Sequence, residues 1–202
     1  MGDDWMSNDG VNNGRRRFLV AATSVVGAAG AVGVAVPFVG SWFPSARAKA
    51  AGAPVKVNIS KLEAGQQIIA EWRGQPVFVS RRTPEALAIL EENVEILADP
   101  ESEASVQPEY VNPHTRAIKP EVLVVMGICT HLGCSPLFRP EVASADMGNQ
   151  WKGGYFCPCH SSRYDMAGRV HSGQPAPLNL PVPPHSYESD DVIILGLDQE
   201  TA

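Results

Sequence analysis

The four cysteines of this chain constrain its fold most strongly, because they all lie within 31 residues and form two short boxes. The first box, residues 129–134, has the sequence CTHLGC, and the second box, residues 157–162, begins a loop with the sequence CPCHSS. Each box holds two cysteines and one histidine, and 22 residues separate the boxes. Such a density of cysteine and histidine indicates that two loops meet, either through disulfides or around a metal centre.

Three chemistries are compatible with these six side chains. Two disulfides would suit an exported protein, but they would leave both histidines without a role. A structural zinc site takes four ligands, so two of the six candidates would remain unused. A 2Fe–2S centre with two cysteines on one iron and two histidines on the other takes one cysteine and one histidine from each of two loops. The pattern favours this third arrangement.

Both boxes resemble those of the Rieske iron–sulfur family, and within it those of the cytochrome bc complexes (ubiquinol–cytochrome c reductase). The resemblance covers residues 15–197 and implies one 2Fe–2S cluster held by the loops 129–134 and 157–164. The ligands that it implies are two cysteines for the inner iron and two histidines for the outer, more exposed iron: Cys129, Cys157, His131 and His160. It also implies a disulfide between Cys134 and Cys159 that joins the two loops.

Residues next to the second box extend the resemblance. In the family, a serine and a tyrosine after the second-box histidine donate hydrogen bonds to sulfur, and Ser162 and Tyr164 occupy those positions. Such bonds raise the reduction potential, which favours a ubiquinol-linked type. Residues 173–180 (GQPAPLNL) resemble the proline-rich loop that covers the cluster, with Gln174 as an extra residue. Ser161 departs from the family, which commonly has a glycine where φ is often positive.

The N-terminal part of the chain predicts a membrane segment. Arg15, Arg16 and Arg17 precede an uncharged run of 29 residues, 18–46, that is built largely from Ala, Val and Gly. A helix needs about 20 apolar residues to cross a bilayer core. We therefore expect a cytoplasmic segment over 1–17, polar and disordered over 1–14, and a transmembrane anchor over 18–44. The arginines predict that the N-terminus stays on the cytoplasmic side.

The same segment has other interpretations. The arginines followed by Phe18-Leu19 resemble a twin-arginine export signal, which bacteria use to move folded proteins across the inner membrane. Residues 48–50 (AKA) would suit a cleavage site, so the signal is either removed or kept as an anchor. A buried helix of a soluble core fits the leading arginines poorly. Residues 45–54 are rich in Ala and contain Gly and Pro, which predicts a flexible hinge.

From residue 55 to 202 the pattern predicts a mainly β domain with one helix. Short apolar or alternating runs indicate strands at 55–59, 67–72, 75–80, 121–127 and 192–197. Thr83 and Pro84 begin a helix with an apolar face that extends to about Ala98. The family resemblance implies a Rieske-type antiparallel β-sandwich with this helix as an insert, preceded by a single transmembrane helix.

Charge excludes one class of partner, and the resemblance implies others. The net charge of −6 provides no basic excess for nucleic acid. The resemblance implies an electron-transfer subunit of a quinol–cytochrome c reductase, acting as an enzyme only within its complex. Its partners would be ubiquinol, a cytochrome b subunit and a c-type cytochrome, in a dimeric complex of the bacterial inner membrane. His160 would accept the quinol proton on the periplasmic side, and the domain would swing between partners.

Two alternatives remain at this point. The small Rieske subunit of a periplasmic molybdenum enzyme such as arsenite oxidase has the same cofactor. A zinc-stapled periplasmic binding module would have no redox function.

Overall fold

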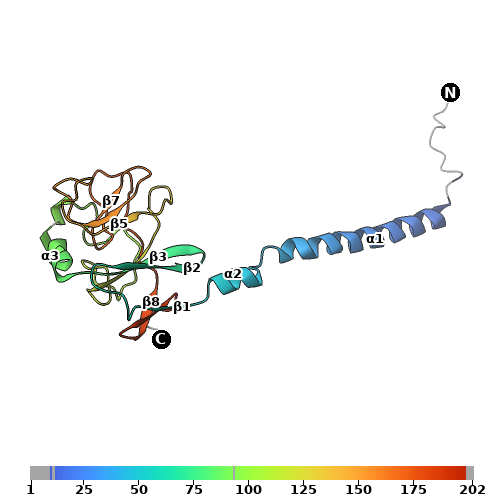
Figure 1. The fold of residues 1–202 in the computed structure, drawn as a ribbon. Helices are drawn as coiled ribbons and strands as arrows, with labels where there is room; N and C mark the ends of the chain where they lie inside the picture. Colours follow the sequence, from blue (N-terminus) through green and yellow to red (C-terminus); the bar gives the residue numbers. More distant parts are fainter. Residues whose placement is uncertain (1–9, 11, 93, 199–202) are drawn as a thin grey trace, which may run out of the picture. The chain divides into compact units, whose positions relative to one another are not determined.

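The computed structural model describes residue 10 and residues 12–92 and 94–198, and the chain divides into two compact units, Met1–Arg47 and Ala48–Ala202 (Figure 1). Most of the segment expected to be disordered, residues 1–9 and 11, lies outside the described residues. Each unit is considered by itself below.

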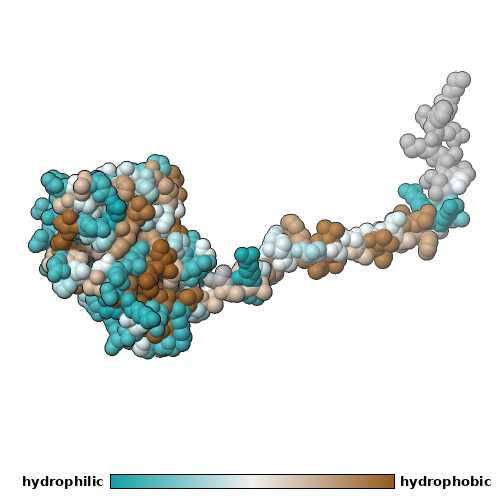
Figure 2. All heavy atoms as spheres, in the orientation of Figure 1, coloured by the Kyte–Doolittle hydropathy of each residue, from teal (hydrophilic) through white to brown (hydrophobic). Residues whose placement is uncertain are grey.

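One helix, α1 (Asn13–Gly40), forms most of the first unit. The side chain of Asn12 caps it by accepting a hydrogen bond from the Arg15 N–H, so the helix begins five residues before the predicted anchor. It ends at Gly40, four residues before the predicted end at 44. Its 28 residues span about 42 Å, which exceeds the roughly 30 Å of a bilayer core. Within its unit α1 buries no side chain, and Figure 2 shows apolar residues along its length.

A six-residue helix, α2 (Ala46–Ala51), lies within the predicted hinge of 45–54. Six of the ten residues of this predicted hinge are therefore helical. Alanine, lysine and arginine are good helix formers, and the segment ARAKAA contains nothing else. A helix this short has little stability of its own.

The described residues of the second unit form nine short strands in three antiparallel sheets. Figure 1 shows the sheets packed together in this unit. The first sheet has the order β1-β9-β8, the second β2-β3-β4 and the third β5-β6-β7. The strands are β1 (Val55–Asn58), β2 (Gln67–Trp72), β3 (Gln75–Arg81), β4 (Val122–Met126), β5 (Leu137–Arg139), β6 (Gly154–Phe156), β7 (Arg163–Tyr164), β8 (His185–Ser189) and β9 (Val192–Leu195). The mainly β, antiparallel fold expected from the sequence is confirmed.

The sheet β2-β3-β4 forms the middle of the core, because both of its faces are covered. Val77 and Val79 of β3 pack with residues of β1 and β9, whereas Phe78 points to the other face, toward β6 and β7. All five residues of β4 are buried, and they alternate between the same two clusters. A strand covered on both faces explains why residues 122–126 form an uninterrupted apolar run.

The insert between β3 and β4 spans residues 82–121 and begins with a helix. Its helix α3 (Pro84–Glu92) begins after Thr83, whose Oγ1 accepts the N–H of Ala86. The helix is shorter than the predicted 84–98, because residues from Val94 to Ile96 form a 3-10 turn and Leu97 pairs as a bridge with His171. The irregular stretch 98–121 then returns the chain to the central sheet at β4.

Candidate iron–sulfur site

The two cysteine boxes fold into loops with the same backbone hydrogen bonds. In the first loop the N–H of Cys129 donates to the Cys134 carbonyl, and the N–H of Gly133 donates back to the Cys129 carbonyl. In the second loop Cys157, Ser162 and Ser161 make the corresponding two bonds. The residue before the last one has a positive φ in both loops, +84° at Gly133 and +65° at Ser161. The departure from glycine at Ser161 therefore leaves the backbone turn intact, with a non-glycine residue in a strained region.

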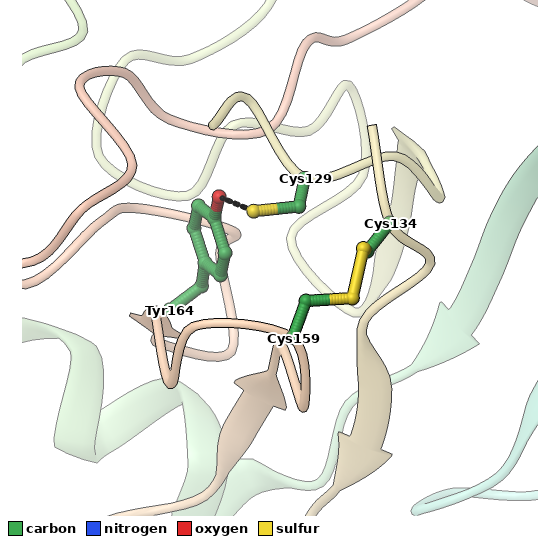
Figure 3. Close-up of a disulfide and its surroundings, with 4 residues drawn as sticks. All are labelled: Cys129, Cys134, Cys159 and Tyr164. Atoms are coloured by element: carbon green, nitrogen blue, oxygen red, sulfur yellow. Dashed lines mark hydrogen bonds between the residues drawn. A yellow bond between two sulfur atoms is a disulfide. The ribbon is translucent and has the colours of Figure 1, made fainter. Parts of the chain in front are cut away.

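A disulfide joins the two loops. Cys134 and Cys159 are bonded, and these are the two cysteines that the family resemblance paired (Figure 3). The bond links residues 25 apart in sequence. Cys129 and Cys157 are free thiols, so the interpretation with two disulfides is wrong.

The free thiols lie inside the protein, and the histidines lie toward its surface. The Cys129 and Cys157 side chains are each 2% exposed. Burial raises the pKa of the Cys157 thiol, and a hydrogen bond with the Cys129 thiol raises it further, so Cys157 is favoured as a neutral group until a cation replaces its proton. The rings of His131 and His160 meet edge to face, with 4.7 Å between their centroids. His160 is exposed and His131 is half-buried.

Tyr164 lies on β7 with its hydroxyl directed at the first loop. Its Oη is 3.2 Å from the Sγ of Cys129 (Figure 3). The same Oη accepts a hydrogen bond from the N–H of Thr130. Thr130 Oγ1 is also 3.3 Å away, but its hydrogen is used on the Leu178 carbonyl. The Tyr164 hydroxyl hydrogen therefore has two acceptors within reach, Cys129 Sγ and Thr130 Oγ1, and the resemblance implies the sulfur. Burial raises the pKa of Tyr164, and the bond to Cys129 raises it further, so the tyrosine remains a donor.

Ser162 contacts the proline loop, residues 173–180. It is fully buried, and its Oγ accepts the N–H of Ala176 at 3.1 Å. Because Oγ is the acceptor in this bond, its own hydrogen remains available to a group in the site. Thr130 ties the first loop to the same segment through the Leu178 carbonyl at 2.6 Å. Sequence reasoning missed Thr130, since its only signal is its place directly after a cysteine.

The residues present fit an iron–sulfur group. The Nδ1 atom of His131 is buried and has no hydrogen-bond partner among the described residues, which is costly unless it serves as a ligand. Two buried free thiols and two adjacent imidazoles provide the mixed cysteine and histidine set of a 2Fe–2S centre with two kinds of iron ligation. The β-sheet fold and this site together define a Rieske-type iron–sulfur protein.

Comparisons with known proteins agree with this class. A family model described as Rieske [2Fe-2S] domain matches residues 56–184, and one described as Ubiquitinol-cytochrome C reductase Fe-S subunit TAT signal matches residues 5–45. The chain is 57% identical to the ubiquinol-cytochrome c reductase iron-sulfur subunit of Allochromatium vinosum, over 98% of this chain and 95% of the relative. The subunit of the same name from Blastochloris viridis is 43% identical, over 94% and 97% of the two chains.

A solved chain titled Hyperthermophilic respiratory Complex III resembles this one with a TM-score of 0.45 and 25% identity, covering 86% of this chain and 98% of that one. The chain belongs to the family of ubiquinol–cytochrome c reductase iron–sulfur subunits. The cofactor of this family is a Rieske 2Fe–2S cluster, and the zinc interpretation of the boxes is set aside on that ground.

Proposed function

We propose that this chain is the electron-transfer subunit of a membrane ubiquinol–cytochrome c reductase. The observation that carries the proposal is that the rings of His131 and His160 meet, with 4.7 Å between their centroids. They lie on two loops that a disulfide joins, and these loops also hold two buried free thiols. The 57% identity to the Allochromatium vinosum subunit over 98% of this chain supports the same role and favours it over a molybdenum-enzyme subunit.

The proposed ligands are Cys129 and Cys157 for one iron and His131 and His160 for the other. Buried thiols suit the inner position, because thiolates bound to iron need no solvation by water. Exposed imidazole suits the outer position, where a partner can reach it. When bound, the 2Fe–2S group supplies one-electron chemistry at a potential raised by its imidazole ligands.

His160 is the proposed catalytic residue. Its ring is exposed, so a quinol hydroxyl can approach within hydrogen-bond distance. We infer that it accepts the proton of ubiquinol while the chain accepts one electron. The Tyr164 hydroxyl is 3.2 Å from the Cys129 sulfur, and the Ser162 hydroxyl keeps its hydrogen free for the site. We propose that both donate to sulfur and stabilise the extra negative charge of the reduced state.

The first unit is proposed as a retained anchor in the bacterial inner membrane, with the second unit in the periplasm. The helix α1 is long and apolar enough to cross a bilayer, and a twin-arginine family model matches the same segment. The proposed domain boundaries are 1–17, 18–44, 45–54 and 55–202, with the second unit moving on the hinge. Its proposed partners are ubiquinol, a cytochrome b subunit and a c-type cytochrome in a dimeric complex.

Purification of the full-length chain from its own membranes tests the function. We expect it to copurify with b- and c-type haem, and we expect the preparation to reduce cytochrome c with ubiquinol. A His160→Gln variant should lose turnover. The matched control, His114→Gln on an exposed loop, should keep it. A preparation that holds the Rieske signal without haem, or that prefers a molybdenum-enzyme substrate, would overturn the assignment.

Two measurements test the anchor. N-terminal sequencing of the assembled protein should find residues that precede the 48–50 segment, and a chain that begins at Ala51 would contradict retention. Replacing Arg15 and Arg16 by lysine preserves the charge but removes the twin-arginine pair. We expect this variant to fail to deliver the second unit to the periplasm, and normal assembly would contradict the export route.

A further inference from the structure

Asn179 lies at the end of the proline loop, is 1% exposed and uses both ends of its amide. Its Nδ2 donates to the Asp99 carbonyl at 2.8 Å and to Ser102 Oγ at 3.0 Å. Its Oδ1 accepts the N–H of Val170 at 2.8 Å, and its own N–H donates to Ser105 Oγ at 3.0 Å. A buried amide with all these groups satisfied fixes the segments that it touches.

The partners of Asn179 on the insert side form a preorganised loop. The carboxylate of Asp99 accepts the N–H groups of Glu103 and Ala104 and the hydroxyl of Ser105. This carboxylate therefore holds residues 99–105 in one conformation and directs the Ser105 oxygen toward Asn179. The insert thus presents three acceptors to a residue about 75 positions later: the Asp99 carbonyl, Ser102 Oγ and Ser105 Oγ.

On its other side the same loop contacts both cysteine boxes. The N–H of Ala176 donates to Ser162 Oγ at 3.1 Å, and the Leu178 carbonyl accepts the Thr130 hydroxyl at 2.6 Å. Ala176 and Leu178 lie within three residues of Asn179 in the chain. The position of the loop therefore determines where the oxygens of Ser162 and Thr130 lie.

We propose that Asn179 is a positioning residue for the iron–sulfur site, through which the helical insert sets the orientation of Ser162. This inference rests on the ligand assignment proposed above. Asn179 holds the proline loop against residues 99–105, the loop holds Ser162 Oγ as an acceptor, and the serine hydrogen is thereby directed into the site. The insert is then part of the redox site, although none of its own side chains lies in either box.

Two consequences follow if the link is removed. The proline loop loses the side-chain bonds that fix its end, so solvent and chelators reach the site more often. The Ser162 hydroxyl is also no longer held by Ala176 and spends part of its time turned away from the sulfur. The second consequence changes the reduction potential, which a purely structural role for Asn179 would leave unchanged.

The test uses the full chain in its membrane complex, with Asn179→Ala as the main variant. We expect cluster loss in the presence of a chelator to become about tenfold faster, as 1.4 kcal/mol of lost loop stabilisation would give. We also expect the reduction potential to fall, by less than in Ser162→Ala. Ser105→Ala removes a single contact with Asn179 and should shift both quantities in the same direction by less. If the Asn179→Ala protein does not accumulate in the membrane, the Ser105→Ala variant tests the proposal in its place.

The control is Asn112→Ala. The Asn112 side chain also accepts two backbone N–H groups, from His114 and Thr115, but it is exposed and its bonds stay within the insert. We expect this variant to keep the wild-type potential. In the double variant Ser162→Ala/Asn179→Ala the potential should equal that of Ser162→Ala alone, because Asn179 acts through the serine.

An unchanged potential in both Asn179→Ala and Ser105→Ala would overturn the inference, and so would an additive shift in the double variant. These outcomes are distinct from failure of the proposed function. If the wild-type protein gave no Rieske-type EPR signal, the ligand assignment would be wrong, whereas a normal wild-type signal with an unresponsive Asn179 would contradict only this inference.

Discussion

At the scale of single residues, the proposed hydrogen bonds to sulfur would raise the reduction potential of the site. A hydrogen bond to a charged group is worth about 1.5–3 kcal/mol, and about 1.4 kcal/mol corresponds to about 59 mV for a one-electron couple. Ser162→Ala and Tyr164→Phe should each lower the reduction potential, by at most about 60–130 mV, because the oxidised state keeps part of each bond. The rate of ubiquinol oxidation should fall as the reduction potential falls.

Redox titration followed by EPR measures these potentials. The two shifts should add if the two donors reach different sulfurs, and the Cys129 contact of Tyr164 is consistent with separate targets. Trp151→Phe offers a control, because the indole donates to the Arg139 carbonyl and not to either box. Unchanged potentials in both variants would mean that Ser162 and Tyr164 do not donate to the sulfurs.

The paired turns at Gly133 and Ser161 give a second residue-scale prediction. A Cβ on Gly133 would meet nothing within 4 Å, so Gly133→Ala adds only the backbone cost of a positive φ, about 1–2 kcal/mol. The thermal midpoint of cluster bleaching should fall by about 2–8 °C. Ser161→Gly should stay within about 2 °C of wild type, since relief of strain is offset by the greater freedom of glycine when unfolded. An unchanged midpoint of cluster bleaching in Gly133→Ala would show that the turn is not fixed at positive φ.

Prediction from sequence was strongest for residues whose chemistry is specific. Cysteine and histidine are scarce, so the two boxes sufficed to favour a 2Fe–2S centre, and the family resemblance then implied both the four ligands and the Cys134–Cys159 pair. Thr130 and Asn179 could not be found this way, because threonine and asparagine are common in loops. Their roles depend on contacts with Leu178, Val170 and residues 99–105, which only the folded chain brings together.

At the scale of elements, the disulfide between the loops contributes to the stability of the site separately from the iron ligands. Cys134→Ser should leave the iron ligands in place but release the loops from each other, at a cost of about 2–5 kcal/mol. We expect an unaltered Mössbauer spectrum and faster loss of the cluster. Cys159→Ser and the double variant should match Cys134→Ser, because each removes the same bond. Altered iron ligation in any of them would mean that the proposed ligand set is wrong.

The longer elements could be predicted, and the shortest could not. The strands at 67–72 and 75–80 match β2 and β3 closely, because alternating residues and the turn between them act locally. The strands β5, β6 and β7 have two or three residues each, too few for any period, and they form because the disulfide and the core hold them together. The helix at 84–98 was predicted too long, because apolar spacing continues into the 3-10 turn and Leu97.

At the scale of the whole molecule, the proposed hinge connects an anchor to a mobile redox domain. Replacing Ala48, Ala50 and Ala53 by proline would break α2 and stiffen residues 45–54 into an extended rod. Ubiquinol turnover should slow while the EPR signal of the cluster stays unchanged. A glycine and serine segment of equal length should keep turnover, because it preserves flexibility. Unchanged turnover in the proline variant would remove the case for domain movement.

The central claim is that two histidines and two cysteines from the two loops bind one 2Fe–2S cluster. Pulsed EPR of the reduced full-length protein, labelled with ¹⁵N-histidine, tests it most directly. The account predicts two strongly coupled histidine nitrogens, and it predicts two irons per chain by metal analysis. A spectrum without histidine coupling, or with a single coupled nitrogen, would contradict the ligand set and the function that rests on it.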